Sequence, residues 1–377
     1  MLETMKRVLD SKFKRNAFML IIAIVFTIIS IYFVNNNEKY YNKTVAKVTS
    51  VQDKTSQTTD TSGNTDETIN QQVTAVVLNG SHKGEKVTFE NNTTFSNAKG
   101  IYLKENDKVF ISIYKNSKDN STAVGLLDFK RDNYLYYMVI LFVLFVLLIG
   151  RIKGFRALVS LTINIFLILA VVTLYLSGWN LLLTSSLASI LFIVLSIFLV
   201  SGINKKSYAA IIGTIAGTVA SMLIAYIVIK FTNGQGIHYE GMEFLTHLPE
   251  QIFFPEILIG TLGAIMDISI SMASSIKEIY DTNPDIERKA LIKSAMEIGK
   301  DIIGTMANTL VFAYISGSMP MLLILLKNSF PISEMISLNL GLEIIRALTG
   351  SIGIVLSIPI TMFISIVFIK RAKIGEK

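Results

Sequence analysis

Residues 134–150, which read YLYYMVILFVLFVLLIG, decide the fold class of this chain. The stretch holds no charged residue and approaches the length that an α-helix needs to cross a bilayer. Similar apolar stretches recur, so the sequence predicts an α-helical polytopic membrane protein with about eight transmembrane helices. The other predicted spans are 17–34, 157–176, 180–201, 208–231, 256–276, 304–326 and 341–369.

The composition of the whole chain agrees with this fold class. Of its 377 residues, 51% are hydrophobic and 17% are charged, whereas soluble domains carry about 25% charged residues. The chain has no cysteine, which excludes disulfides, thiolate metal sites, covalent haem attachment and a lipoprotein anchor. The net charge of +7 is explained by basic loops at an inner membrane surface, so nucleic acid is not predicted as a partner.

The distribution of basic residues predicts the orientation of the spans. Lysines and arginines follow the second, fourth and sixth predicted spans and end the chain, whereas the short loops 177–179 and 232–255 have none. Because Lys and Arg collect on the cytoplasmic side, both termini are predicted to be cytoplasmic and residues 35–133 extracytoplasmic. Residues 1–34, a basic start followed by an apolar run, are interpreted as an uncleaved signal anchor.

Residues 35–133 change completely in composition and are predicted to form a small β-barrel-like domain of the OB or SH3-like kind. Val109, Ile111 and Ile113 alternate with other side chains, as in a half-buried strand. Residues 52–70 are nearly all Ser, Thr, Gln, Asp and Asn, so they are predicted to be a flexible excursion. The five predicted strands are 44–51, 72–78, 85–90, 108–114 and 122–129.

The predicted bundle, 134–377, includes one helix outside the spans. Residues from about 284 to 302 place apolar side chains on one face and lysines elsewhere, which predicts an amphipathic helix along the inner membrane surface. Asn283 is its expected N-cap and Pro284 its expected first turn. The helix could be a connector or a mobile gate, and the sequence leaves both open. Its apolar face consists of Leu291, Ala295, Ile298 and Ile302.

Asp267 lies near the middle of the predicted span 256–276. An aspartate at the centre of a spanning helix costs about 2.5–3.5 kcal/mol on insertion scales, so it normally faces the protein interior or water. Two interpretations stay open: a proton, cation or substrate ligand, or a hydrogen-bonded side chain that joins two helices. Small and polar residues share its face, namely Gly260, Gly263, Ala264, Ser271 and Ser274.

The next predicted span carries a comparable face and then an interruption. Gly317 and Pro320 fall within residues 316–320, and proline removes a helical hydrogen bond. The sequence predicts either a half-broken helix that exposes backbone groups to an ion or substrate, or an ordinary proline kink. The face consists of Thr305, Asn308, Thr309, Phe312 and Ser316.

Glu343 and Arg346 stand at i, i+3 near the start of the last predicted span. They can pair with each other, or each with a partner on another helix. One interpretation is a structural clamp. The other is a switch in which Arg346 pairs with Asp267 in one state and releases it in another.

The sequence contains no recognisable motif for catalysis, a cofactor or a metal. Walker, HExxH, GxSxG and kinase motifs are absent, and Asp267 and Asp301 have no recognisable catalytic spacing. One loop has oxygen and nitrogen ligands, but their spacing matches no tight metal motif. The chain is therefore expected not to be an enzyme and to hold no cofactor or metal. The loop residues are His238, Glu240, Glu243 and His247.

Four strings carry a family resemblance: residues 260–267 (GTLGAIMD), Asn283-Pro284, 299–310 (GKDIIGTMANTL) and 343–353 (EIIRALTGSIG). Together with 150–154, 202–205 and the turn 78–84, they resemble the YibE/F-like family of bacterial multi-pass membrane proteins. The resemblance implies a protein of the bacterial cytoplasmic membrane and no established activity. The family's motif positions are matched by Asp267, Asp301, Thr305, Asn308, Glu343 and Arg346.

These features favour a secondary transporter or permease for a small solute or ion. Asp267 would bind a coupling proton or cation, and Ser271, Thr305, Asn308 and Ser316 would contact the transported species. A second copy of the chain, or a similar subunit, could complete the pathway through the lipid bilayer. The alternative is a non-transporting scaffold or envelope sensor whose β-domain binds a partner.

Overall fold

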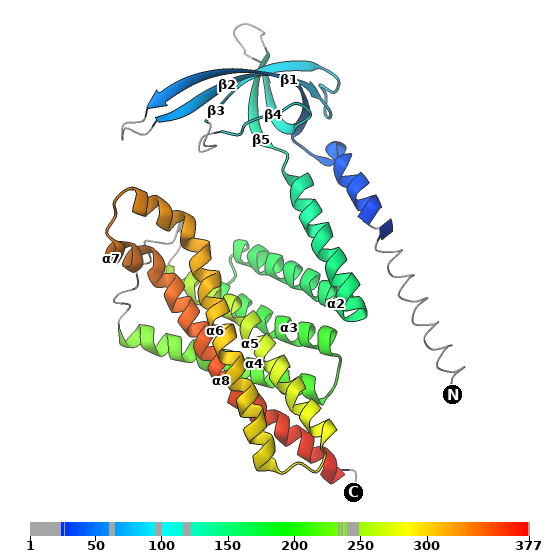
Figure 1. Ribbon diagram of the computed structural model, residues 1–377, viewed down its shortest axis with the longest axis vertical. Coiled ribbons are helices and arrows are strands. Elements are labelled where there is room, and N and C mark those ends of the chain that lie inside the picture. Colours follow the sequence, from blue (N-terminus) through cyan, green and yellow to red (C-terminus); the bar gives the residue numbers. More distant parts are fainter. Residues whose placement is uncertain are drawn as a thin grey trace, which may run out of the picture. The chain divides into compact units, whose positions relative to one another are not determined.

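The computed structural model divides the chain into two compact units, Met1–Gly154 and Phe155–Lys377 (Figure 1). The predicted signal anchor lies partly outside the residues that the structure describes, and the loop residues at 238, 240, 243 and 247 lie wholly outside them. The described residues are 24–25, 27–59, 65–94, 100–115, 122–232, 234, 237, 239 and 249–375.

The first unit contains a five-stranded antiparallel sheet in the order β3-β2-β1-β4-β5. The edge strands β3 and β5 approach each other, so the sheet is nearly closed and barrel-like. Buried and exposed side chains alternate along β3, as expected of a strand that covers a core with one face. The five predicted strands are confirmed as β1 (Thr44–Thr59), β2 (Thr65–Val77), β3 (Lys86–Thr94), β4 (Lys108–Lys115) and β5 (Thr122–Phe129).

The hairpin of β1 and β2 corrects the expectation for residues 52–70. In place of a flexible excursion, Gln52 pairs with Gln72, and the ladder continues to the pair of Thr59 and Thr65. The side chains of residues 52–57 are exposed, so burial does not hold this ribbon. Its backbone hydrogen bonds and its many threonines, which favour extended backbone, account for the two long strands.

A hydrogen-bond network around a buried lysine and Asp132 joins the two chain segments that enter and leave the sheet. Lys130 is 2% exposed, and its Nζ donates to Asp132 Oδ2 at 2.9 Å and to Asn133 Oδ1 at 2.8 Å. Asp132 also accepts from Tyr41 Oη at 2.5 Å and from Asn37 Nδ2 at 3.2 Å. Burial and the hydrogen bond to Asp132 raise the pKa of Tyr41 to about 12, so its hydroxyl remains a donor at neutral pH. These five residues are called the junction clamp below.

Asn79 supports the junction clamp from the turn after β2. Its Nδ2 donates to the backbone carbonyls of Glu38, Tyr41 and Lys43, and its Oδ1 accepts from the N–H of Val45 at 2.6 Å. The sequence marked Asn79 only as a turn residue. Its buried side chain also satisfies four backbone groups of the segment that leads into β1.

Replacing Lys130 by methionine tests the junction clamp. Lys130→Met keeps most of the side-chain volume but leaves Asp132 without its cation, which should lower the stability of the first unit by about 2–3 kcal/mol. Arg131→Met is the matched control, because Arg131 is exposed and only weakly paired with Asp128 at 3.5 Å. Thermal unfolding of the full-length protein in detergent, with limited proteolysis to locate the loss, measures both. Equal behaviour of the two variants would contradict a stabilising role.

Helix α2 (Asp132–Leu176) combines two of the predicted spans, 134–150 and 157–176. Arg151 separates them, since its φ of 50° and ψ of −126° are not helical. At Gly154 a Cβ atom would collide with the backbone carbonyl oxygen of Val146, so the chain needs a glycine at this bend. The break lies where the sequence predicts a basic loop between two spans.

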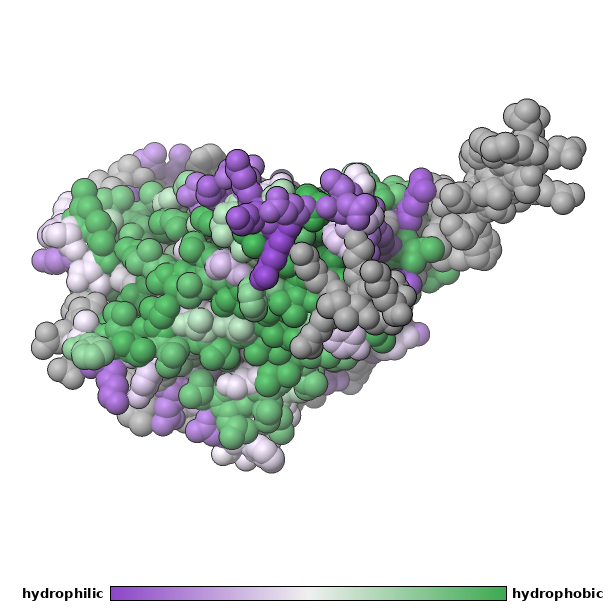
Figure 2. All heavy atoms as spheres, turned by 90° about the horizontal axis from the view of Figure 1, so that it is seen from below, coloured by the Kyte–Doolittle hydropathy of each residue, from purple (hydrophilic) through white to green (hydrophobic). Residues whose placement is uncertain are grey.

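Six helices in the described part of the chain are long and apolar enough to cross a membrane, which indicates a membrane-embedded, multi-pass protein. Hydrophobic side chains cover much of the face seen in Figure 2. In the second unit, helices α4, α5 and α6 pack against α8 (Figure 1). Its elements are α3 (Leu181–Ser201), α4 (Lys205–Phe231), α5 (Pro249–Thr282), α6 (Arg288–Lys327), α7 (Ile332–Met335), the π-helical turn η3 (Ile336–Leu340) and α8 (Gly341–Gly375).

Helices α4 and α8 approach each other closely through small residues. A Cβ atom on Gly213 would collide with the side chain of Thr361, and one on Gly217 would lie 2.9 Å from Cβ of Ser357. Ser221, one turn further along α4, donates from Oγ to a backbone carbonyl of α8 at 2.5 Å. The Gly213 and Gly217 pair therefore serves helix packing, as small residues commonly do in membranes.

Helix α6 corrects the expectation of a separate helix along the membrane surface at 284–302. It begins at Arg288 and runs without interruption to Lys327, about 60 Å at 1.5 Å per residue. The predicted apolar face is real, but Leu291 and Ala295 are buried in the core formed with α5 and α8. The amphipathic pattern therefore reflects packing of this face within the bundle.

The predicted break at 316–320 is also absent from α6. The helix continues through Pro320, and Ser316 Oγ donates to the backbone carbonyl of Ala313 at 2.9 Å. Of the two interpretations left open by the sequence, the structure has a proline within a continuous helix, which membrane helices tolerate.

Two matched glycine substitutions test the packing of α4 on α8. Gly213→Ala should destabilise the protein by about 1–3 kcal/mol, because the added methyl group overpacks the contact with Thr361. Gly304→Ala, also within a helix but with no atom within 4 Å of the added Cβ, should raise stability slightly, by about 0.5–1 kcal/mol. Thermal unfolding in detergent measures the stability of both variants. Equal stability of Gly213→Ala and Gly304→Ala would show that the α4–α8 contact can accommodate a methyl group.

Candidate functional site

One narrow stripe of α5 stays exposed while the residues on both sides of it are buried or half-buried. Ile265 and Ile268 belong to the bundle core, whereas Asp267 between them is exposed. Ala264, which the sequence also placed on this face, is half-buried. The exposed residues are called the polar stripe and comprise Glu256, Gly260, Gly263, Asp267 and Ser271.

The predicted face of α6 lies at the same level as the polar stripe. The connection 283–287 is short, so α5 and α6 run antiparallel, and a Cβ on Gly260 would lie 2.5 Å from Tyr314 Oη. About two turns along α5 from Gly260 lead to Asp267, and about two turns back along α6 from Tyr314 lead to Asn308. The structure thus places Asp267 and Asn308 at a similar height along the two neighbouring helices, and both are exposed.

The polar side chains on these two faces differ in their hydrogen bonding. Thr305 and Thr309 donate from Oγ1 to backbone carbonyls of their own helix at 3.0 and 2.8 Å, a common arrangement for hydroxyls in helices. Asp267, Ser271 and Asn308 have no hydrogen-bond or ion-pair partner among the described residues. The carboxylate and the amide are therefore free to bind a ligand or another chain.

Arg346 lies in a charged cluster at the start of α8. It is 8% exposed, and its guanidinium group contacts Glu343 at 2.6 Å and Glu256 at 3.2 Å. The guanidinium carbon also lies 5.9 Å from the ring centroid of Tyr314 on α6. The cluster joins α5, α6 and α8 and carries two carboxylates for one cation. Of the pairings that the sequence left open, Arg346 makes two: one with Glu343 on its own helix and one with Glu256 on another helix.

Arg346 and Asp267 are not brought together. Glu256, the partner of Arg346 on α5, precedes Asp267 by about 16 Å along the helix axis at 1.5 Å per residue. Sequence reasoning missed Glu256, although an acidic residue directly after Pro255 at the start of an apolar span was a usable signal. In this structure the two terminal nitrogens of Arg346 pair with Glu343 and Glu256, its buried Nε has no hydrogen-bond partner, and Asp267 has no ion-pair partner among the described residues.

Another candidate residue from the sequence, Asp301, lies away from these groups. Asp301 is exposed on α6, about two turns before Asn308, and makes no ion pair among the described residues. Within that part of the chain, no group of three or more His, Asp or Glu side chains is placed to hold a metal ion. The exposed polar faces of α5 and α6 and the Arg346 cluster are therefore the candidate functional groups among the described residues.

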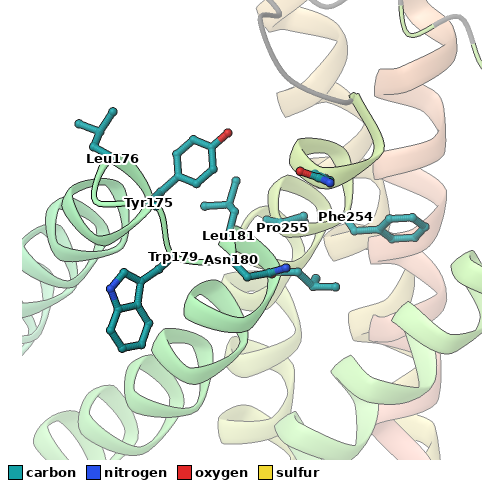
Figure 3. Close-up of a pocket in the computed structure, with 10 residues that line it drawn as sticks. Tyr175, Leu176, Trp179, Asn180, Leu181, Phe254 and Pro255 are labelled. Carbon is teal, nitrogen blue, oxygen red and sulfur yellow. The ribbon is translucent and has the colours of Figure 1, made fainter.

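A hollow of about 700 Å³ lies between the α2–α3 connection and α5 (Figure 3). Tyr175, Trp179 and Asn180 line it from the connection, and Phe254 and Pro255 line it from α5. Asn180 also caps α3 by accepting from the N–H of Leu183 at 3.1 Å. The lining has aromatic rings and amides but no charged group, so it offers apolar contacts and little recognition of an ion.

The Arg346 cluster should be structural, and charge removal tests this. Arg346→Met leaves Glu343 facing Glu256 without a cation and should cost about 3 kcal/mol of stability. Glu256→Gln should cost less than 1 kcal/mol, since the Glu256 side chain is 42% exposed. Thermal unfolding in detergent measures both, and the double variant Arg346→Met/Glu343→Leu should recover part of the loss. Full stability of Arg346→Met alone would contradict the structural role.

Comparison with known proteins identifies both units of the chain. The family model for YibE/F-like protein matches residues 138–371, and the model for the YibE/F family N-terminal domain matches residues 39–128. No curated protein and no solved structure matches the chain. The matched regions cover most of the sequence, including the helices that carry the polar stripe. The chain therefore belongs to the YibE/F-like family.

Proposed function

We propose that this protein is a secondary transporter or permease that moves a small cation, or a small solute coupled to one, along the polar stripe. The exposed carboxylate of Asp267 supports this most strongly. It lies midway along a helix that is long and apolar enough to cross a membrane and has no partner among the described residues. An isolated aspartate at such a depth costs about 2.5–3.5 kcal/mol, so a proton, a cation or water must compensate it.

The neighbouring groups suit a small cation or a proton. Ser271 lies one turn from Asp267 on the same stripe, and Asn308 lies at the same level on α6. Thr305 and Ser316 donate within their own helix, yet their oxygen atoms can still accept or coordinate. In this proposal Asp267 binds the cation, Ser271 and Asn308 supply neutral oxygen ligands, and no covalent chemistry takes place.

A second subunit would complete the pathway. The polar stripe and the α6 face are exposed in a single chain, and lipid cannot satisfy a carboxylate or an amide. A second copy of this chain, or a similar membrane subunit, would cover both faces and leave a polar path between them. The proposed location is the bacterial cytoplasmic membrane, with the barrel-like sheet outside, which rests on the distribution of Lys and Arg among the loops.

Cysteine accessibility tests whether the polar stripe meets water. The chain has no native cysteine, so Ser271→Cys and Asn308→Cys can be labelled without background by a membrane-impermeant maleimide, in cells and in inverted vesicles. Both should react from at least one side, because a water-filled path admits the reagent and lets the thiol ionise to the reactive thiolate. Phe363→Cys is the control, since Phe363 is an exposed apolar residue of α8 and should face lipid and stay unlabelled. Absence of labelling at both Ser271→Cys and Asn308→Cys would contradict a water-filled path.

Flux measurements then test the role of the carboxylate. Proteoliposomes that contain a pH-sensitive dye and experience an imposed proton gradient report proton movement. Asp267→Asn should abolish the protein-dependent flux, and Asp285→Asn, in the α5–α6 connection, should retain it. Equal flux in both variants would contradict the role of Asp267.

The junction clamp favours a second candidate, a non-transporting scaffold or envelope sensor. Asp132, the first residue of α2, is hydrogen-bonded to Lys130, Tyr41 and Asn37 next to the sheet, so a partner bound to the barrel could act on that helix. Lys130→Met distinguishes the two functions. A transporter should keep its flux when the clamp is broken, whereas a sensor should lose its response to the envelope signal.

A further inference from the structure

A second hollow, of about 300 Å³, lies between α4, α5 and α8 at the end of the helices that the sequence predicts to face the cytoplasm. It is separate from the polar stripe and is formed where α4 begins and where α5 and α8 approach their ends. The residues that line it include Lys205, Lys206, Lys277, Asp281 and Ser365.

The charge of this hollow is positive. Three lysines line it against one carboxylate, and that carboxylate, Asp281, already pairs with Lys277 at 2.5 Å. Lys205 and Lys206 have no ion-pair partner among the described residues. They stand in the first turn of α4, a helix of 27 residues, whose dipole adds positive potential at this end. An anion is therefore the complementary ligand.

A buried hydroxyl gives independent support for a ligand. Ser365 is 3% exposed, and its Oγ has no hydrogen-bond partner. Other serines of the same helix, Ser351 and Ser357, donate to backbone carbonyls at 2.8 Å. A buried hydroxyl without a partner is costly, and Ser365 lines the hollow, so a bound acceptor would satisfy it.

Part of the remaining wall is apolar. Ala209, Ala273, Phe368 and Ile369 face the same hollow as the lysines, which a freely soluble phosphate would not need. A basic pocket with apolar walls between membrane helices suits the headgroup of an anionic lipid. We propose that this pocket binds an anionic phospholipid of the inner leaflet, with the phosphate at Lys205, Lys206 and the Ser365 hydroxyl and the acyl chains along Phe368 and Ile369.

Lipid titration of the purified full-length protein tests this proposal. Delipidated protein in a neutral detergent is titrated with phosphatidylglycerol, and binding is followed by native mass spectrometry. Lys205→Gln/Lys206→Gln should bind about 30-fold more weakly, at about five-fold per lysine. Lys289→Gln/Lys293→Gln, which removes two exposed lysines of the same predicted side, is the matched control and should bind like the wild type.

Two further measurements test whether the ligand is an anionic phospholipid. Phosphatidylcholine and inorganic phosphate replace phosphatidylglycerol in parallel titrations, and both should bind much more weakly. Ser365→Ala, which removes only one oxygen atom, should weaken phosphatidylglycerol binding about five-fold and serves if the double lysine variant fails to fold. Equal effects of the two lysine pairs, no effect of Ser365→Ala, or competition by inorganic phosphate at equal concentration would each overturn the proposal.

Discussion

The close approach of α8 to its neighbours is the constraint on which the helical unit depends. Gly213 of α4 leaves room for Thr361, and Gly353 of α8 leaves room for Ile265 of α5. In lipid, apolar side chains gain little by leaving one apolar environment for another, so close van der Waals packing supplies much of the association energy. Because α4, α5 and α6 all pack on α8, the position of each polar side chain follows from how these helices meet it.

The polar stripe is a direct consequence of this packing. Helix α5 contacts α3, α4, α6 and α8, which cover most of its circumference and leave only a line of small and acidic residues exposed. The same arrangement separates the charges. Arg346 is enclosed with Glu343 and Glu256, whereas Asp267 remains without a counter-charge. Glu256, which belongs to the Arg346 ion cluster, and the isolated Asp267 thus lie on one face of α5. Only Asp267 has no partner among the described residues.

Lysines have different surroundings at two places in the chain. In the first unit, Lys130 is buried and pairs with Asp132, and Asp132 also accepts from Tyr41 and Asn37 of the segment that enters the sheet, so the charged pair helps to hold two segments together. Lys205 and Lys206 line a hollow without counter-ions among the described residues, so their charge is available to an anion. Desolvation with partners gives rigidity, whereas partial exposure without partners gives a binding site.

The sequence by itself determined the family, through its motif strings, and the apolar helices and five strands, because these depend on composition and periodicity. It left open whether Glu343 and Arg346 pair with each other or with other helices. Tertiary structure decided that residues 52–59 and 65–72 form a ribbon, since backbone ladders need no apolar surface. It also decided that the amphipathic segment at 284–302 continues into α6 and that Glu256 completes the Arg346 cluster. Spacing tells which face of a helix a residue occupies, but only the packing of neighbouring helices decides which face is covered.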